Sequence, residues 1–233
     1  MNNSSSRSVQ IYSDYYGQAA TGAFQYVLPP AEEMDRMIRK ENIVAARNSR
    51  ALDYGCGEGR NSLHLSHMGY SVLATDVSKG TVEATRKRTL GKAITVKLLS
   101  PEDSLPTEDA SIDLILAFEV LHWLGNRKSF EYYLNEFSRA LKPDGDFIFT
   151  MPTEVHFLKT KYADEVEENV FLCCSGSRKG CVFFSPPFKC LKILLGRNGF
   201  RISRLMRYDR FEDGAENDLT HPFSMYCLNV KLR

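Results

Sequence analysis

The sequence predicts an α/β fold: a doubly wound, mostly parallel seven-stranded sheet with helices on both faces and a terminal antiparallel hairpin. Three observations predict it. Short apolar runs alternate with amphipathic segments from residue 31 to residue 151, a glycine-rich turn follows the first apolar run, and two strand-like runs end the chain. Apolar strands that alternate with helices over short connections are typical of right-handed βαβ units and a parallel sheet covered on both faces.

The first elements follow this alternation. Acidic residues early and basic residues late predict a helix over residues 31–47. RALDY (50–54) and SVLAT (71–75) have the apolar character of buried strands, and residues 61–68 and 79–90 have helical patterns.

The alternation continues to residue 151. Residues 94–99 and 112–118 predict two further strands, and SFEYYLNEFSRAL (129–141) predicts a strongly amphipathic helix. Residues 143–145 read Pro-Asp-Gly, which predicts a turn before a strand over residues 146–151.

The pattern breaks after residue 151. Residues 152–185 contain no clear strand–helix pair, and a structureless loop of that length is unusual in a compact domain. They therefore predict an insertion, either a lid or a small β-structure. A helix is expected from residue 188, and the runs at 200–208 and 223–232 are joined by a short polar link, which favours an antiparallel pair.

Length and composition indicate one domain over residues 31–233, preceded by a cap or lid segment over residues 1–30. Of the 233 residues, 43% are hydrophobic and 25% are charged, which argues against a disordered or fibrous protein. The net charge of +1 gives no global attraction to nucleic acid or membrane. The N-terminus has no apolar signal core, no apolar run reaches membrane-spanning length, and the six cysteines are irregularly spaced. We therefore expect a cytoplasmic protein with reduced thiols and no membrane partner.

The strongest motif is the segment LDYGCGEG at residues 52–59. Asp53 ends the first strand, and Gly55, Gly57 and Gly59 follow at every second position. Glycines allow a positive φ and let a ligand approach the backbone closely, and ligands bind open α/β sheets at the carboxyl ends of their strands. A dinucleotide site needs G-x-G-x-x-G, but the third glycine position of that pattern is Arg60 here, so the turn is a different device.

These residues resemble a known family. LDYGCGEGRNSLHLSHMGYSVLATDVS, SPEDSLPTEDASIDLILAFEVLHWL and LKPDGDFIFTMP are similar to segments of class I S-adenosylmethionine-dependent methyltransferases of the small-molecule type. The resemblance covers residues 30–151 well and the last helix and strands more loosely. It implies a Rossmann-like fold, S-adenosyl-L-methionine as cofactor, and S-adenosyl-L-homocysteine as product.

The resemblance also implies roles for individual residues. Asp53 and the backbone of the glycine turn would contact the methionine portion of the cofactor, and Asp76 would accept both ribose hydroxyls. The alternative for Asp76 is a helix cap. Where the family often has an acid that holds the adenine, this chain has Pro101, so either Glu102 or Asp103 would take over, or backbone alone would hold the adenine. The residues implied to bind the cofactor are Asp53, Gly55, Cys56, Gly57, Gly59, Asp76, Val77, Glu102, Asp103 and Phe118.

The acceptor side has weaker signals. His122 follows the fourth strand and is the candidate base, with Glu119 as a weaker candidate. The alternative is a packed histidine whose ring donates to a backbone carbonyl. The residues expected to line the substrate site are Tyr15, Tyr16, Trp123 and His156. The tyrosines belong to the N-terminal segment, which either folds over the cofactor or anchors itself on the core. No metal is expected, because no set of ligands has metal-binding spacing.

The sequence favours methyl transfer to a small molecule by in-line displacement. Residues 178–210 carry nine Lys/Arg and one Asp, so an RNA- or protein-directed methyltransferase is one alternative, and a solvated helix face and edge strand is the simpler explanation of the charge. A non-catalytic domain that binds S-adenosylmethionine and regulates a partner is the other alternative. Oligomeric state leaves no signal in the sequence.

Overall fold

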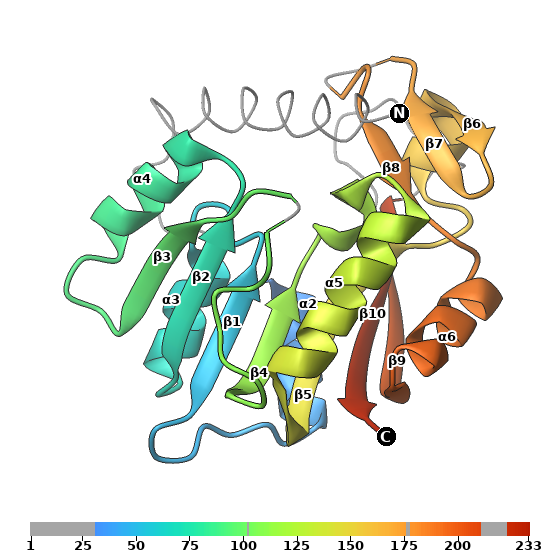
Figure 1. Cartoon of the computed structure of the whole chain (residues 1–233). Coiled ribbons are helices and arrows are strands. Elements are labelled where there is room, and N and C mark those ends of the chain that lie inside the picture. The colour runs from blue at the N-terminus through green and yellow to red at the C-terminus, as the bar shows by residue number, and fades with distance from the viewer. Residues whose placement is uncertain (1–30, 102, 176–177, 211–222) are drawn as a thin grey trace.

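The computed structural model describes residues 31–101, 103–175, 178–210 and 223–233 (Figure 1). The predicted cap over residues 1–30, with Tyr15 and Tyr16, lies outside the described residues, as does Glu102. Those predictions therefore stay predictions. Within the described ranges, no helix is long and apolar enough to cross a membrane.

A seven-stranded sheet forms the centre of the molecule, in the order β3-β2-β1-β4-β5-β10-β9. The first five strands are parallel, and β10 runs antiparallel to both β5 and β9. This confirms the predicted fold class, including the terminal hairpin. The strands are β1 (Arg50–Tyr54), β2 (Ser71–Asp76), β3 (Ile94–Leu98), β4 (Ile112–Ala117), β5 (Leu141–Pro152), β9 (Phe200–Arg210) and β10 (Phe223–Leu232).

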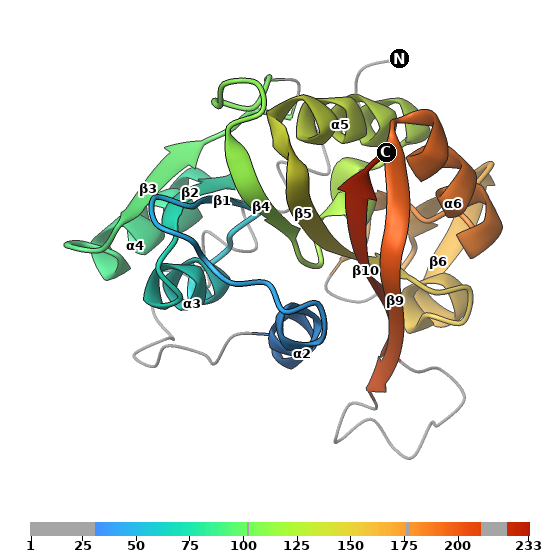
Figure 2. The same cartoon turned by 90° about the horizontal axis from the view of Figure 1, so that it is seen from below.

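Helices cover both faces of this sheet. Seen from below (Figure 2), α5 (Arg127–Ala140) and α6 (Phe188–Arg197) lie on one side, and α2 (Glu32–Lys40) and α3 (Arg60–His67) on the other. Helix α4 (Lys79–Arg88) packs against β2 and β3. Successive residues of a strand point to opposite faces, so Leu52 joins the core under α5 and Ala51 joins the core under α2 and α3.

Helix α2 is shorter than predicted: it ends at Lys40, and the prediction of helix over residues 41–47 was wrong. Asn42 takes φ 52°, which a helix cannot continue. The preceding Glu41 carboxylate accepts hydrogen bonds from Ser203 Oγ (2.6 Å) and Asn229 Nδ2 (3.1 Å), more than 160 residues away in the chain. A tertiary contact therefore ends the helix where its local sequence would extend it.

The predicted turn at residues 143–145 lies inside strand β5. Its register against β4 jumps from Leu141 opposite Ile112 to Asp146 opposite Leu114. The Pro-Asp-Gly segment is thus a bulge that lets the strand resume, as bulges do when one strand has extra residues.

Residues 152–185 contain a second sheet, of three antiparallel strands in the order β6-β7-β8. The strands are β6 (Ala163–Glu167), β7 (Val170–Cys173) and β8 (Val182–Phe184), preceded by a short π-helix, η2 (Leu158–Tyr162). Figure 1 shows this sheet beyond the carboxyl ends of the parallel strands. Strand β8 packs against η1 (Leu121–Leu124), the short helix that follows β4.

Candidate functional site

The site lies at the point where the strand order reverses. Strand β1 pairs with β2 on one side and with β4 on the other. Ligands of doubly wound sheets bind outside the carboxyl ends of the strands at such a point. The glycine turn follows β1 and Val120 follows β4, and a Cβ added to Gly55 would lie 2.5 Å from Val120 Cγ2. The two segments touch, and only glycine fits at position 55.

The glycine turn is a rigid structure rather than a loose loop. Gly55, Gly57 and Gly59 take φ of 70°, 52° and 80°, a region that strains other residues. The N–H groups of Gly55 and Cys56 donate to the carbonyl of Thr75 at 2.8 and 2.9 Å. Among the described residues, no atom lies within 4 Å of a Cβ added to Gly57, so this position of the turn is open with respect to that part of the chain.

Asp53, at the end of β1, is a buried carboxyl group with 1% exposure. Ser62 Oγ donates to its Oδ2 at 2.5 Å from helix α3. Burial raises the pKa of Asp53 to about 6, against the hydrogen bond from Ser62, and the nearby charge of Asp76 raises it further. A positively charged ligand beside Asp53 would lower its pKa again and favour the ionised form.

Asp76 ends β2 and joins the glycine turn directly. Its Oδ2 accepts from the N–H of Gly57 (3.0 Å), and its Oδ1 accepts from the N–H of Ser78 (2.9 Å). Helix α4 is capped by Ser78, whose Oγ accepts from the N–H of Thr81 at 3.3 Å. Because Ser78 is the N-cap of helix α4, Asp76 does not have that role. Burial raises its pKa, although hydrogen bonds from the backbone N–H groups of Ser78, Gly57 and Val77 oppose this. A carboxylate has about four acceptor sites, so Asp76 keeps room for a further donor.

These features fit S-adenosylmethionine. The ligand carries an ammonium and a sulfonium, and two neighbouring carboxylates whose pKa values are both raised are stabilised by positive charge. At the open side of Gly57, the methionine portion of the ligand can lie directly against the backbone. The Cys56 side chain packs with Ala74, Val82 and Val96, and its Sγ lies 3.6 Å from the carbonyl oxygen of Gly57. Val77 lies between the two hydrogen-bonded residues Asp76 and Ser78.

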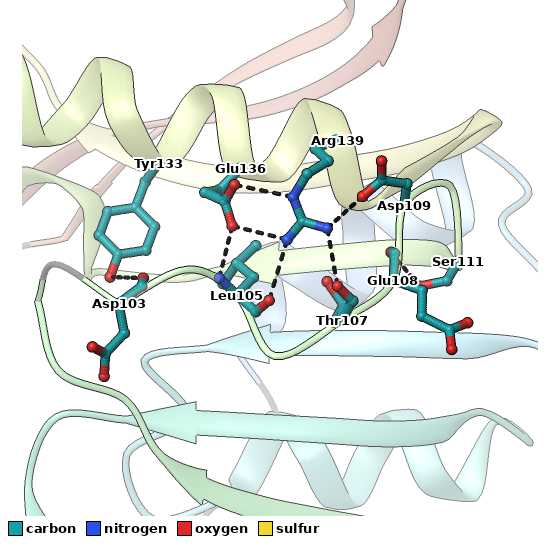
Figure 3. Close-up of polar contacts among 9 residues, drawn as sticks. All are labelled: Asp103, Leu105, Thr107, Glu108, Asp109, Ser111, Tyr133, Glu136 and Arg139. Atoms are coloured by element: carbon teal, nitrogen blue, oxygen red, sulfur yellow. Dashed lines mark hydrogen bonds and ion pairs between the residues drawn. The ribbon is translucent and has the colours of Figure 1, made fainter.

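The loop after β3 carries Asp103, and Figure 3 shows how it is tied to helix α5. Tyr133 Oη donates to the Asp103 carbonyl at 3.2 Å, and Glu136 Oε2 accepts from the N–H of Leu105 at 2.7 Å. Arg139 donates to the carbonyls of Thr107 and Leu105. The exposed Asp103 carboxylate accepts from the N–H of Ser100 at 2.9 Å, so it shapes the loop and keeps its second oxygen for a donor.

The residues after β4 divide between core and site. Phe118 is buried against the α2–α3 face of the sheet. Glu119 takes φ 56°, unusual for a residue with a side chain, and its N–H donates to the buried Thr150 Oγ1 at 2.7 Å. Backbone held in such a conformation by its surroundings occurs often at functional sites.

His122, Trp123 and His156 come together under the second sheet. The His122 ring lies 4.7 Å from the Trp123 ring, and Trp123 lies 5.7 Å from Phe183 of β8. Burial holds the pKa of His122 well below its usual value, and the positive charge of Arg178 lowers it further. Among the described residues, His122 Nδ1 has no hydrogen-bond partner although it is buried. The packed-histidine explanation required a ring N–H bound to a carbonyl, and at Nδ1 that bond is missing.

His156 is also buried, and burial lowers its pKa to about 3, with Arg178 and Lys159 adding to the effect. Its Nδ1 accepts from the N–H of Leu158 at 3.2 Å, and its ring stacks on Phe157. Both histidines are therefore neutral at physiological pH. His156 Nδ1 accepts a hydrogen bond from the backbone, whereas His122 Nδ1 has no partner among the described residues.

The basic stretch is partly neutralised. Arg204 pairs with Glu41, and Arg207 pairs with Asp209 at 3.3 Å. In the described ranges, no group of three His, Cys, Asp or Glu side chains has the arrangement of a metal site.

Sequence reasoning missed four residues that shape the site: Ser62, Thr85, Arg88 and Thr150. Each is an ordinary polar residue of a helix or strand, and its role depends on a partner between nine and 31 residues away. No local signal marks such contacts.

Comparison with known proteins agrees with this geometry. The profile of a family described as "Methyltransferase domain" matches residues 52–149. An uncharacterized methyltransferase of Mycobacterium bovis is 30% identical over 129 residues, which cover 54% of this chain and 48% of that protein. The mitochondrial arginine-hydroxylase NDUFAF5 of Mus musculus is 29% identical over 102 residues, covering 43% and 28% of the two chains. The matched region thus spans less than half the length of these relatives.

Among solved structures, a Burkholderia thailandensis 1,6-didemethyltoxoflavin-N1-methyltransferase with bound 1,6-didemethyltoxoflavin and S-adenosylhomocysteine has the same fold. The TM-score is 0.64 at 16% identity, over 98% of this chain and 86% of the other. The glycine turn, the two carboxylates and the profile match over residues 52–149 lead to one family. Residues 52–149 of the chain match the methyltransferase-domain family, and proteins named as S-adenosylmethionine-dependent methyltransferases are among its relatives and among the structures with the same fold.

Proposed function

We propose that this protein transfers the methyl group of S-adenosylmethionine to a small-molecule acceptor. The single observation that carries the proposal is the glycine turn, open at Gly57 and flanked by the carboxylates of Asp53 and Asp76 where the strand order reverses. When bound, the cofactor supplies an electrophilic methyl carbon. The acceptor's lone pair forms the new bond to that carbon, and the electron pair of the broken C–S bond stays on sulfur.

The chain's own residues bind and orient in this proposal. Asp53 would complement the positive charge of the methionine portion, and Asp76 would accept the ribose hydroxyls with the lone pairs that Gly57 and Ser78 leave. Glu119 would border the cofactor towards the acceptor, and Asp103 would meet the adenine. The Phe118 side chain packs in the core, so only its backbone would face the cofactor. Alignment and exclusion of water are the main needs of an in-line displacement.

Support for a small acceptor comes from the side of the site under the second sheet. His122 and Trp123 contact Phe183 of β8, which stacks on Phe171 of β7. His156 contacts Phe157 and Phe223. An apolar wall with a few polar groups is typical of small-molecule sites. The methyltransferase from Burkholderia thailandensis has the small molecule 1,6-didemethyltoxoflavin bound, and its similar fold supports the proposal.

His122 is the proposed proton acceptor, with Glu119 as the weaker candidate. Because burial lowers the pKa of His122, its imidazole is neutral and available, but it holds a proton weakly. We therefore expect an acceptor atom that reaches the site with a free lone pair, such as an amine nitrogen, and that gives up its proton to His122 only as the new bond to carbon forms.

Calorimetric titration with S-adenosylhomocysteine tests the proposal. We expect micromolar binding by the wild type, and at least tenfold weaker binding by Asp76→Ala and by Gly57→Val, which would fill the open side of the turn. Gly91→Val is a matched control, because Gly91 also has a positive φ (76°) and open space around its Cα, but lies in the loop after α4. A wild-type protein that does not bind S-adenosylhomocysteine would contradict the proposal.

Acceptor size is tested separately. Methyl transfer from labelled cofactor is measured with a fractionated small-metabolite mixture and with total protein or RNA as acceptors. Label in the small-molecule fraction is the expected result. Label only in protein or RNA would refute a small acceptor while leaving the methyltransferase activity intact.

A further inference from the structure

Helix α4 holds the glycine turn from outside the sheet. Thr85 Oγ1 donates to the carbonyl of Gly57 at 2.8 Å. Arg88 Nη1 donates to the carbonyl of Glu58 at 2.7 Å and contacts the Glu58 carboxylate at 3.2 Å. Residues three apart lie on one face of a helix. Two consecutive carbonyls of the turn are thus bound by one face of α4.

These hydrogen bonds from α4 determine the orientation of the peptide bond between Gly57 and Glu58. The described residues contain no cis peptide bond, and in a trans peptide the C=O and the following N–H point in opposite directions. Because the Gly57 carbonyl points to α4, the Glu58 N–H points away from it. Within the described part of the chain, that N–H makes no hydrogen bond, whereas those of Gly55, Gly57 and Gly59 are all bonded.

Thr85 is shaped for this position. Its Cγ2 lies 2.8 Å from the place where a Cβ of Gly59 would be, so its methyl group packs against the bare Cα of the third glycine. Its hydroxyl meanwhile reaches the carbonyl of Gly57. A β-branched side chain is stiff at χ1, so one conformation satisfies both contacts.

We propose that Thr85 and Arg88 are positioning residues of the cofactor site, which aim the Glu58 N–H at the carboxylate of the ligand's amino-acid portion. This inference rests on the proposed function. A backbone N–H directed at an anion forms a charge-assisted hydrogen bond, which is stronger than a neutral one. The carboxylates of Asp53 and Asp76 cannot bind that end of the ligand, because they carry the same charge.

The test is the dissociation constant of S-adenosylhomocysteine for full-length variants, measured by calorimetry. Thr85→Val keeps the shape and the methyl contact but removes the hydroxyl, and we expect about tenfold weaker binding. Thr85→Ser keeps the hydroxyl but loses the methyl contact, so we expect a smaller loss of affinity than in Thr85→Val. Arg88→Met should weaken binding by about three- to tenfold.

The matched control is Thr89→Val. Thr89 Oγ1 donates to the carbonyl of Thr85 at 2.8 Å, so this variant also loses one hydroxyl hydrogen bond on α4, but none to the turn. We expect Thr89→Val to bind S-adenosylhomocysteine with wild-type affinity, and its melting temperature to fall about as much as that of Thr85→Val. In parallel, the amide NMR signal of Glu58 should shift on adding S-adenosylhomocysteine to the wild type and shift less in Thr85→Val.

Two results would overturn the inference: wild-type affinity in both Thr85→Val and Arg88→Met, or an equal loss of affinity in Thr89→Val. If the wild type itself fails to bind S-adenosylhomocysteine, it is the proposed function that fails. If the wild type binds S-adenosylhomocysteine and both Thr85→Val and Arg88→Met bind it equally well, only the positioning role is rejected.

Discussion

Replacing Asp53 by asparagine should stabilise the free protein at neutral pH while weakening cofactor binding. Asparagine has nearly the same shape and can still accept the hydroxyl of Ser62, which donates to Asp53 Oδ2 at 2.5 Å. It carries no charge, so it avoids the cost of burying an ionised carboxyl group. The same missing charge removes the complement of the ligand's ammonium. The two effects therefore have opposite signs.

The magnitude follows from the shift of the Asp53 pKa from 3.8 to about 6. At about 1.36 kcal/mol per unit, ionised Asp53 costs the folded state on the order of 3 kcal/mol. Because the folded-state pKa is the higher one, the folded protein binds the proton more tightly than the unfolded chain. The wild type should lose this amount of stability as the pH rises from about 4 through 6. Asp53→Asn should not show that loss.

Urea denaturation of both proteins between pH 4 and pH 8 measures this difference. The curves should nearly coincide at pH 4, and the variant should be more stable above pH 6.5 by a few kcal/mol. Asp144→Asn is the control, since it makes the same change of charge at an exposed position on the β5 bulge. A stability difference between wild type and Asp53→Asn that is independent of pH would refute the reasoning. So would tighter binding of S-adenosylhomocysteine by the variant.

Two further predictions concern the segment after β4. Glu119→Gly relieves a side-chain residue at φ 56° and should raise stability by about 0.5–1 kcal/mol, measured as a shift of the thermal midpoint; a lower midpoint would mean that the Glu119 side chain holds the turn. His122→Asn should lower kcat about 100-fold if His122 accepts a proton, with little change in S-adenosylhomocysteine affinity. Equal losses of kcat, affinity and thermal stability would instead indicate a histidine that only packs.

Several parts of this protein could be predicted because their causes are local. Alternation of apolar and amphipathic segments up to residue 151 was enough to predict the parallel sheet, since each element needs only its own periodicity to find a buried face. The glycines at 55, 57 and 59 marked the turn, because positive φ is a property of single residues. Their position after a strand also placed the turn at the correct edge of the sheet.

Other parts depended on contacts between distant residues. The end of α2 was predicted too late, because Glu41 is held by Ser203 and Asn229. The second sheet in residues 152–185 has short strands that pair only with each other, so its pattern was too weak for assignment.

The sequence by itself therefore determined the fold class, the order of the elements and the glycine turn, because backbone conformation and hydrophobic periodicity are written in neighbouring residues. Only the tertiary structure decided the polar details of the site. Ser62 reaches Asp53, Thr85 reaches Gly57, and His122 lies buried under strand β8. The physical reason is that a hydrogen bond or a pKa shift depends on which groups folding brings within a few ångströms, and spacing along the chain does not record that distance.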